Sequence, residues 1–183
     1  MNEINKNNLK KETSHEKAVI KSLLTNARKS SIDIAKETGL TRQTVSKIIN
    51  KIENDGRLWG YPAVMEPELL DNHFFIVLIK LKGEINKAEL IKKISNPTII
   101  NQFTEENFRY SSYLHGKFDL ITSFYASNII EVEKRINKMF NPIRKYFSEL
   151  YLHQTLITFR RMGIVNPNLI KDINEHFNIS TIE

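Results

Sequence analysis

The sequence predicts an α+β protein in which an N-terminal helix-turn-helix, winged or simple, is followed by a ferredoxin-like βαββαβ domain. Two short amphipathic stretches flank a Gly-Leu-Thr turn at residues 39–41, which is the layout of a helix-turn-helix. Beyond residue 72, strand and helix signals alternate in the order of a ferredoxin-like fold. The 183 residues include no cysteine, which excludes disulfides, zinc fingers and thiol catalysis.

The first 66 residues divide into an arm and a helical domain. Residues 1–14 are polar, and we expect them to form a flexible arm rather than a signal peptide. Residues 15–66 form the expected helix-turn-helix DNA-binding domain. Its first helix ends near Arg28 and would complete a three-helix core. The apolar residues that mark this helix are Ala18, Ile20, Leu23 and Leu24.

The turn between the next two helices is the most informative part of this domain. Ile32, Ile34 and Ala35 have the apolar spacing of a helix that packs on one face. Gly39 follows directly and reaches positive φ without a Cβ clash, so it can end that helix and turn the chain. Thr41 is a good N-cap for the second helix, because its hydroxyl can accept a free backbone N–H.

The second helix of the pair, from about Arg42 to Asp55, has one buried side and one polar side. The buried stripe repeats at i, i+3, i+4 and i+7. It comprises Val45, Ile48, Ile49 and Ile52. The other side carries mostly hydrogen-bond donors, with acidic residues only at the far end, and Gly56 then stops the helix.

The donors on this polar side favour contact with a DNA major groove. Arg and Gln side chains read base edges, while Ser, Thr and Lys commonly bind phosphate oxygens. The residues expected to contact DNA are Thr41, Arg42, Gln43, Thr44, Ser46, Lys47 and Lys51. The alternative is that these polar residues only form a solvent-exposed helix face. The preceding helix, the turn and the cap favour DNA contact over this alternative.

The charge distribution supports a polyanionic partner. Residues 1–66 carry 12 Lys and Arg against 8 Asp and Glu, a net charge of +4, whereas residues 67–183 carry 15 against 13, a net charge of +2. Neutralised phosphates supply most of the non-specific affinity for DNA. The sequence has neither a membrane-length apolar run nor a signal peptide, so we expect a cytoplasmic protein.

Residues 67–160 are expected to form the second domain, after a hook over residues 57–65 and a boundary near residues 66–72. The predicted strands are 73–82, 99–105, 108–115, 118–125 and 150–159, and the predicted helices are 86–95 and 129–140, with a further turn to 147. The residues predicted to face inward from these helices are Leu90, Ile91, Ile94, Ile129, Val132, Ile136 and Met139. Residues 161–183 form a C-terminal extension with a helix at 168–177.

The sheet itself predicts self-association. Strand 73–82 is apolar on both faces, whereas the helices of a ferredoxin-like fold cover only one face of the sheet. The uncovered apolar face needs a partner, and a second copy of the chain is the simple solution. We therefore expect a homodimer or a higher homo-oligomer.

Two motifs carry a resemblance to a known family. Residues 56–67 read Gly-Arg-Leu-Trp-Gly-Tyr-Pro-Ala-Val-Met-Glu-Pro, and residues 116–119 read Gly-Lys-Phe-Asp. The first resembles the join that follows the helix-turn-helix in the Lrp/AsnC, or feast/famine, family of prokaryotic transcription regulators, and the second resembles that family's Gly-x-aromatic-Asp signature. The resemblance covers roughly residues 16–160 and implies a transcription regulator that dimerises through its sheet and often assembles further.

The resemblance also implies a small-molecule effector, frequently an amino acid, bound between subunits near the second motif. Gly116 and Asp119 are then the effector-site candidates, and Asp119 is suited to hold an α-amino group. A structural alternative stays open for both, because Gly116 suits a turn with positive φ and Asp119 can bond turn amides. The chain departs from the family pattern at Ile48, a position that is often basic, and in its two terminal extensions.

Enzyme functions find less support in the sequence, which contains no Walker loop, Rossmann glycine pattern or Gly-x-Ser-x-Gly elbow. Siroheme decarboxylases resemble Lrp/AsnC proteins in fold, and such a role here would use Arg109, Tyr110 and His115. A metal or acid–base site would need His115 and His153 to approach across the sheet. We expect no catalytic activity, no cofactor and no metal.

The sequence therefore predicts a sequence-specific, DNA-binding transcription regulator that responds to a small molecule such as an amino acid. Its expected partners are double-stranded DNA and further copies of itself, and no membrane. The alternative is a DNA-architectural protein of the same fold that binds no ligand.

Overall fold

The computed structural model describes residues 3–97, 101 and 108–179, and it describes side chains within these ranges from residue 14 onward. The chain divides into two compact units, Met1–Val64 with Phe159–Asn168 and Met65–Thr158 with Leu169–Glu183. Each unit contains its own cluster of buried apolar side chains. In the described part of the chain, no helix combines the length and the apolar character needed to cross a membrane.

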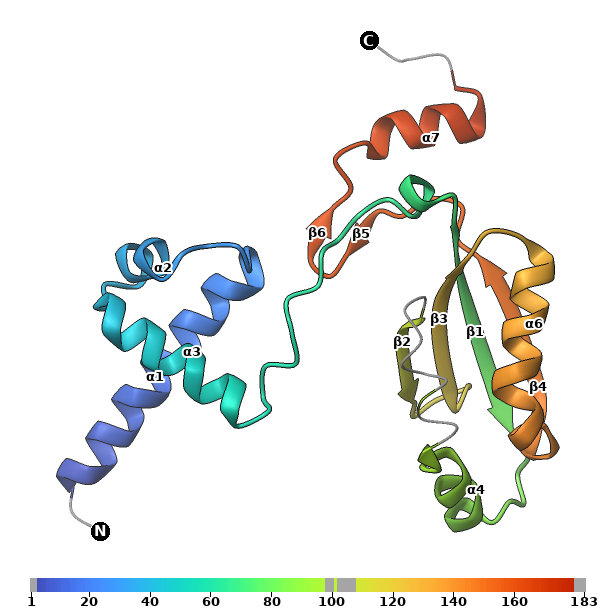
Figure 1. The fold of residues 1–183 in the computed structure, drawn as a ribbon, viewed down its shortest axis with the longest axis horizontal. Coiled ribbons are helices and arrows are strands. Elements are labelled where there is room, and N and C mark those ends of the chain that lie inside the picture. The colour runs from blue at the N-terminus through green and yellow to red at the C-terminus, as the bar shows by residue number, and fades with distance from the viewer. Residues whose placement is uncertain (1–2, 98–100, 102–107, 180–183) are drawn as a thin grey trace. The chain divides into compact units, whose positions relative to one another are not determined.

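Three helices form the N-terminal unit, namely α1 (Glu3–Thr25), α2 (Ser31–Thr38) and α3 (Arg42–Asn54) (Figure 1). Their shared core consists of Val19, Leu23, Ile34, Val45 and Ile52. The predicted stripe of α3 is confirmed, because its other two members, Ile48 and Ile49, pack partly buried against this core. Leu24, one of the apolar residues that marked this helix, is 76% exposed, since Val19 and Leu23 occupy the inward side of α1.

Residues 1–14, which were expected to form a flexible arm, are helical from Glu3 onward, where α1 begins. No glycine or proline occurs before Gly39, so nothing in the local sequence interrupts a helix there. At its other end, α1 stops at Thr25, three residues before the predicted Arg28.

The ends of α2 are set by local hydrogen bonds. Ser30 caps the N-terminus, where its hydroxyl accepts the Asp33 N–H at 3.2 Å. Gly39 closes the C-terminus with φ +69°, and the next N–H, that of Leu40, returns to the Ala35 carbonyl at 3.1 Å. The predicted glycine turn is therefore confirmed.

The second unit is built on a four-stranded antiparallel sheet in the order β2-β3-β1-β4. Its strands are β1 (His73–Leu81), β2 (Phe108–Tyr113), β3 (Leu120–Ala126) and β4 (Phe147–Gln154). The helical elements are η1 (Pro67–Leu70), α4 (Lys87–Ile94), α6 (Ile129–Phe140) and η2 (Asn141–Tyr146) (Figure 1). This order of strands is that of the predicted ferredoxin-like fold.

One face of the sheet is covered by helices. Phe75, Val77 and Ile79 of β1 are buried together with Leu90 of α4 and Val132 of α6. Two residues predicted to face inward do not, since Ile91 is 61% and Ile129 is 56% exposed. Each lies at the edge of its helical stripe, where sequence periodicity alone does not separate inside from outside.

Other predicted boundaries need small corrections. The strand expected at 99–105 lies outside the described residues, apart from Asn101. The last strand runs over Phe147–Gln154 rather than 150–159, because its partner β1 begins at His73. Thr155 makes the final backbone bond to this neighbour, from its N–H to the Phe74 carbonyl at 2.8 Å.

Among the described residues, the opposite face of the sheet contributes no residue to this buried apolar cluster, although Ser123 and Tyr125 of β3 are buried on it. Its side chains come from alternate positions of three strands and include Phe74, Ile76, Leu78, Ile121 and Tyr151. All five are half-buried or exposed, with Tyr151 at 40%. We call this set the open sheet face.

The C-terminal extension contains two elements. A short hairpin pairs β5 (Arg160–Arg161) with β6 (Ile164–Val165), and its turn residues Met162 and Gly163 both have positive φ. Helix α7 (Leu169–Phe177) confirms the helix predicted at 168–177 to within one residue. The hairpin was not predicted.

Candidate nucleic-acid interface

Thr41 fixes the start of α3. Its hydroxyl accepts the Thr44 N–H at 3.1 Å and lies 2.9 Å from the Thr44 hydroxyl. The predicted cap is therefore confirmed. Both threonine hydroxyls are engaged within the helix start, and Thr44 is half-buried, so these two predicted DNA contacts are less available than the rest.

The outward side of α3 carries the remaining predicted residues. At about 100° of rotation per residue, Gln43, Lys47 and Asn50 lie opposite the buried stripe. The exposed polar side chains on this side are Arg42, Gln43, Lys47, Asn50 and Lys51, which together we call the donor surface. Ser46 is half-buried at its edge. The structure adds Asn50, whose seven-residue spacing from Gln43 places the two on one line along the helix.

The side chains of the donor surface make no hydrogen bond or ion pair within the described part of the protein, although the charge of Lys51 contributes to lowering the pKa of Glu16. All five side chains can donate hydrogen bonds, and three of them are cationic, namely Arg42, Lys47 and Lys51. Such a surface is complementary to phosphates and to the acceptor-rich edge of the major groove.

The acidic residues of α3 are bound to other parts of the same unit. Glu53 accepts a hydrogen bond from the Tyr61 hydroxyl at 2.7 Å. Asp55 lies 3.3 Å from Arg57, whose guanidinium also contacts Glu16 of α1 at 2.5 Å. This contact lowers the pKa of Glu16, mainly through the hydrogen bond from Arg57. Near the end of α3, Asp55 is thus paired with a cation and Glu53 with a neutral hydroxyl of the same unit.

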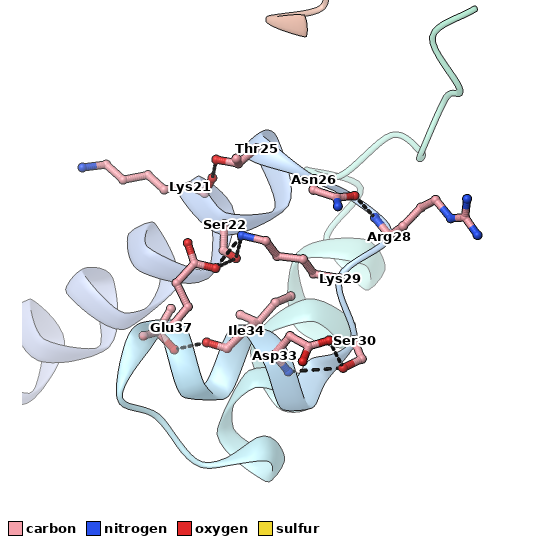
Figure 2. Close-up of polar contacts among 11 residues, drawn as sticks. Lys21, Ser22, Thr25, Asn26, Arg28, Lys29, Ser30, Asp33, Ile34 and Glu37 are labelled. Carbon is pink, nitrogen blue, oxygen red and sulfur yellow. Dashed lines mark hydrogen bonds and ion pairs between the residues drawn. The ribbon is translucent and has the colours of Figure 1, made fainter.

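A second polar cluster joins α1 to α2 (Figure 2). The buried Ser22 hydroxyl donates to Glu37 at 2.6 Å, and the Lys29 ammonium lies 2.6 Å from the same carboxylate oxygen. The hydrogen bonds from Lys29 and from Ser22 lower the pKa of Glu37. The cluster fixes α2 against α1, so it holds the first helix of the helix-turn-helix rather than contacting a ligand.

The hairpin motif is organised differently. Asp119 accepts the Leu81 N–H on one carboxylate oxygen at 2.8 Å, and its own backbone N–H donates to the Ile79 carbonyl at 2.9 Å. Gly116 sits in the turn with φ +147° and is exposed. Asp119 therefore has a structural role, as the alternative to an effector contact predicts. It accepts a hydrogen bond from a strand amide beside the register irregularity at Lys80/Leu81.

The residues considered for enzyme functions do not assemble into a site. His115 lies in the loop after β2 and His153 lies on β4, and β3 and β1 separate these two strands. The Arg109 guanidinium packs over the Tyr125 ring, 4.7 Å from its centroid. Among the described residues, no group of three or more His, Asp or Glu side chains is arranged to hold a metal ion.

Comparison with known proteins connects this geometry to a family. A family model described as winged helix-turn-helix DNA-binding matches residues 13–58, which contain all three helices' contributions to the N-terminal core. A solved AsnC family transcriptional regulator from Agrobacterium tumefaciens has the same fold, with a TM-score of 0.60, 17% identity, and coverage of 80% of this chain and 92% of that one.

A second solved structure, a transcriptional regulator from Neisseria meningitidis in complex with L-Met, superposes with a TM-score of 0.59 at 10% identity and covers 85% of this chain and 97% of its own. In sequence, the chain is 24% identical over 121 residues to the leucine-responsive regulatory protein of Haemophilus influenzae. That match spans 63% of this chain and 67% of the relative. The helix-turn-helix of this chain thus matches a DNA-binding family model, and the chain is similar in sequence and in fold to transcription regulators of the Lrp/AsnC family.

The Lrp/AsnC resemblance pointed to Ile48 as a position that is often basic. Here Ile48 is half-buried and packs against the helical core, so it supplies no phosphate contact. Sequence reasoning also missed the two side-chain contacts that hold the Lrp/AsnC join to the helix-turn-helix, those of Arg57 and Tyr61. Pairings between residues far apart in sequence leave no periodic signal, although Arg57 and Tyr61 both lie in the motif that carries the resemblance.

Proposed function

We propose that the protein binds spaced DNA half-sites as a homodimer, with α3 of each protomer in a major groove. The observation that carries this proposal is the donor surface, on which five exposed side chains make no hydrogen bond or ion pair among the described residues. In a helix-turn-helix, the second helix enters the groove and its first residues reach base edges. Arg42 and Gln43 stand at that end of α3, and Lys47 and Lys51 stand further along for phosphates.

The same proposal assigns roles to the chain's segments. Residues 15–66 act as the DNA-binding domain, and residues 67–160 act as the dimerisation domain. Support for dimerisation comes from the open sheet face, which presents apolar side chains of three strands. A C2 dimer covers this face with the same face of a second copy, as isologous contacts do.

We further propose that a small molecule such as an amino acid modulates this binding. Support comes from the Neisseria meningitidis relative, which was solved with L-Met, and from the hairpin of residues 114–119. One oxygen of Asp119 is used by Leu81, and the other has no partner among the described residues and remains for an α-amino group. Gly116 leaves the turn open beside it, since a Cβ there would meet nothing within 4 Å.

Footprinting on genomic DNA fragments tests the main proposal. A regulator protects discrete sites with paired half-sites, and its affinity falls steeply as salt rises. A DNA-architectural protein of the same fold would instead coat fragments without regard to sequence. Continuous protection at every sequence tested would replace the regulator by this alternative.

A thermal-shift screen against the twenty amino acids tests the effector proposal separately. A ligand at 100 times its Kd stabilises the native state by about 2.7 kcal/mol, which is a measurable rise in Tm. The Asp119→Asn variant serves as the matched control, because it keeps an acceptor for Leu81 but loses the negative charge. A rise in Tm that is equal in both proteins would remove Asp119 from the effector site.

A further inference from the structure

The segment that follows α3 stays bound to the N-terminal unit through hydrogen bonds and packing. The N–H groups of Arg57 and Leu58 both donate to the Ile52 carbonyl, at 2.9 and 3.0 Å. Leu58 packs against the helical core, and Arg57 reaches the carboxylates of Glu16 and Asp55. These contacts bind the first two residues of the connecting segment to the N-terminal unit.

A further contact lies at Tyr61. Its hydroxyl donates to Glu53 at 2.7 Å, so the chain returns to the side of α3 four residues after Arg57. Tyr61 is 46% exposed, and its partial burial, followed by the hydrogen bond to Glu53, raises the pKa of Tyr61 to about 12. Between these anchors Trp59 points outward and is 96% exposed.

Gly60 makes this return path accessible. Alternate side chains of an extended segment point to opposite sides, so Tyr61 would otherwise point away from the side that Leu58 occupies. Gly60 has φ +155°, which glycine adopts more readily than other residues and which changes the direction of the chain. The glycine at position 60 therefore fits the local path of the chain.

Past Tyr61 the hydrogen bonds to the helices end. Pro62 and Ala63 are exposed, and no hydrogen bond joins Pro62, Ala63 or Val64 to any described residue, although Met1–Val64 and Phe159–Asn168 group in one compact unit. The hydrogen bond between Tyr61 and Glu53, which we call the latch, is therefore the last hydrogen bond that holds the connecting segment to α3 among the described residues.

We propose that Tyr61, held by Glu53, is a positioning residue that sets the spacing between the two half-sites the dimer accepts. This inference rests on the proposed dimeric DNA binding. Release of the latch frees residues 59–61, and three extended residues add up to about 10 Å of reach per protomer. That length is about three base pairs at 3.4 Å each. A latched protein therefore accepts a narrow range of half-site spacings, and an unlatched one accepts a wider range.

A spacing-selection experiment tests the latch. Wild-type protein, Tyr61→Phe and Glu53→Ala are each incubated with a DNA library in which two copies of the selected half-site are separated by variable lengths. We expect wild-type enrichment at one spacing and enrichment spread over up to about six additional base pairs for both variants, about three from each protomer. Glu53→Gln keeps an acceptor oxygen and should behave as wild type, while Tyr113→Phe is the matched control, since Tyr113 is 60% exposed in the second unit.

The result that overturns the proposal is an unchanged spacing profile in Tyr61→Phe and Glu53→Ala. A wild-type profile with no spacing preference overturns it equally. Affinity for a single half-site is measured in parallel and is expected to stay within twofold, because neither residue belongs to the donor surface. A loss of single-site affinity as large as that caused by Gln43→Ala would assign Tyr61 to DNA contact and overturn the positioning role.

A second measurement needs no DNA and separates failure of the latch from failure of the proposed function. Trp59 is the one tryptophan of the chain and lies between Leu58 and Tyr61. Time-resolved fluorescence anisotropy of Trp59 in the full chain is expected to gain a nanosecond component in Tyr61→Phe but not in Glu53→Gln. Identical decays in wild type and Tyr61→Phe would show that Tyr61 does not restrain the segment, even if DNA binding is confirmed.

Discussion

The outward side of α3 and the hairpin of residues 114–119 are both short motifs with polar side chains, yet they differ in what those side chains bind. On α3, the five side chains of the donor surface make no hydrogen bond or ion pair among the described residues. In the hairpin, Asp119 already holds the Leu81 N–H at 2.8 Å. A polar side chain without an intramolecular hydrogen bond is available to a ligand. A side chain that already makes such a bond contributes to the stability of the fold.

Substitutions in the two motifs are therefore expected to change different properties of the protein. Changes on α3 are expected to alter DNA binding and leave the fold intact, because nothing in the described protein depends on those side chains. Changes at Asp119 are expected to alter stability whether or not an effector binds. An α3 variant that lowers stability, or an Asp119 variant that leaves stability unchanged, would contradict this distinction between the two motifs.

The largest expected effect is on DNA affinity, from Lys47→Ala combined with Lys51→Ala. Each phosphate contact contributes about 0.9 to the slope of log K against log salt, so two lost contacts lower affinity by roughly a hundredfold near 0.1 M salt. Salt titrations of DNA binding measure the slope, with Lys134→Ala on α6 as the control. If the double variant keeps the wild-type slope, these lysines do not contact phosphates.

The next effect concerns sequence preference. Gln43→Ala is expected to relax discrimination at one base pair by roughly 1–3 kcal/mol, because a bidentate base contact is lost. Binding-site selection with the variant measures this change, and chemical denaturation should show unaltered stability. An unchanged selected motif would remove Gln43 from the base contacts.

A smaller effect is expected on stability in the other region. Asp119→Ala leaves the Leu81 N–H without its acceptor, and we expect a loss of about 1–2 kcal/mol in the free energy of unfolding. Urea denaturation, followed by a signal from the second unit, measures this loss of unfolding free energy. Asp119→Asn should retain most of the stability. Equal denaturation midpoints for Asp119→Ala and wild type would mean that the hydrogen bond between Leu81 and Asp119 does not contribute to stability.

The smallest effect is a pH dependence within the helical unit. Hydrogen bonds from Lys29 and Ser22 lower the pKa of Glu37 from its ordinary value of 4.5 in the folded state. The stabilisation they provide is complete above 4.5 and is lost as the pH falls through the lowered value. Melting curves between about pH 6 and pH 3 should show a shallower acid loss for Glu37→Gln than for wild type, with Glu133→Gln behaving as wild type.

Much of the fold follows from signals that lie within a few residues of each other. The cap at Thr41, the turn at Gly39 and the stripe of α3 depend on local chemistry, and the structure confirms them. The same holds for α6, whose predicted range of 129–140 matches the observed helix. Local periodicity fails for Ile91 and Ile129, since only the packing of other elements decides which edge of a stripe is buried.

The site was predictable in part for the same reason. The donor surface follows from the helical period, once the buried stripe is known. The contacts of Ser22 with Glu37, of Tyr61 with Glu53 and of Leu81 with Asp119 join residues 8 to 38 positions apart. Such pairings depend on how helices and strands meet in space, so no pattern in a single sequence reveals them.

The two separate clusters of buried apolar side chains have a consequence for how the molecule responds to heat. Among the residues whose side chains are described, the helical cluster has five buried members and the sheet cluster has thirteen, so we expect the helical unit to be the weaker of the two. Calorimetry of the intact chain is therefore expected to give two endotherms, with the helical unit melting first. Added operator DNA would raise the lower endotherm alone, because mass action stabilises only the part that holds the ligand.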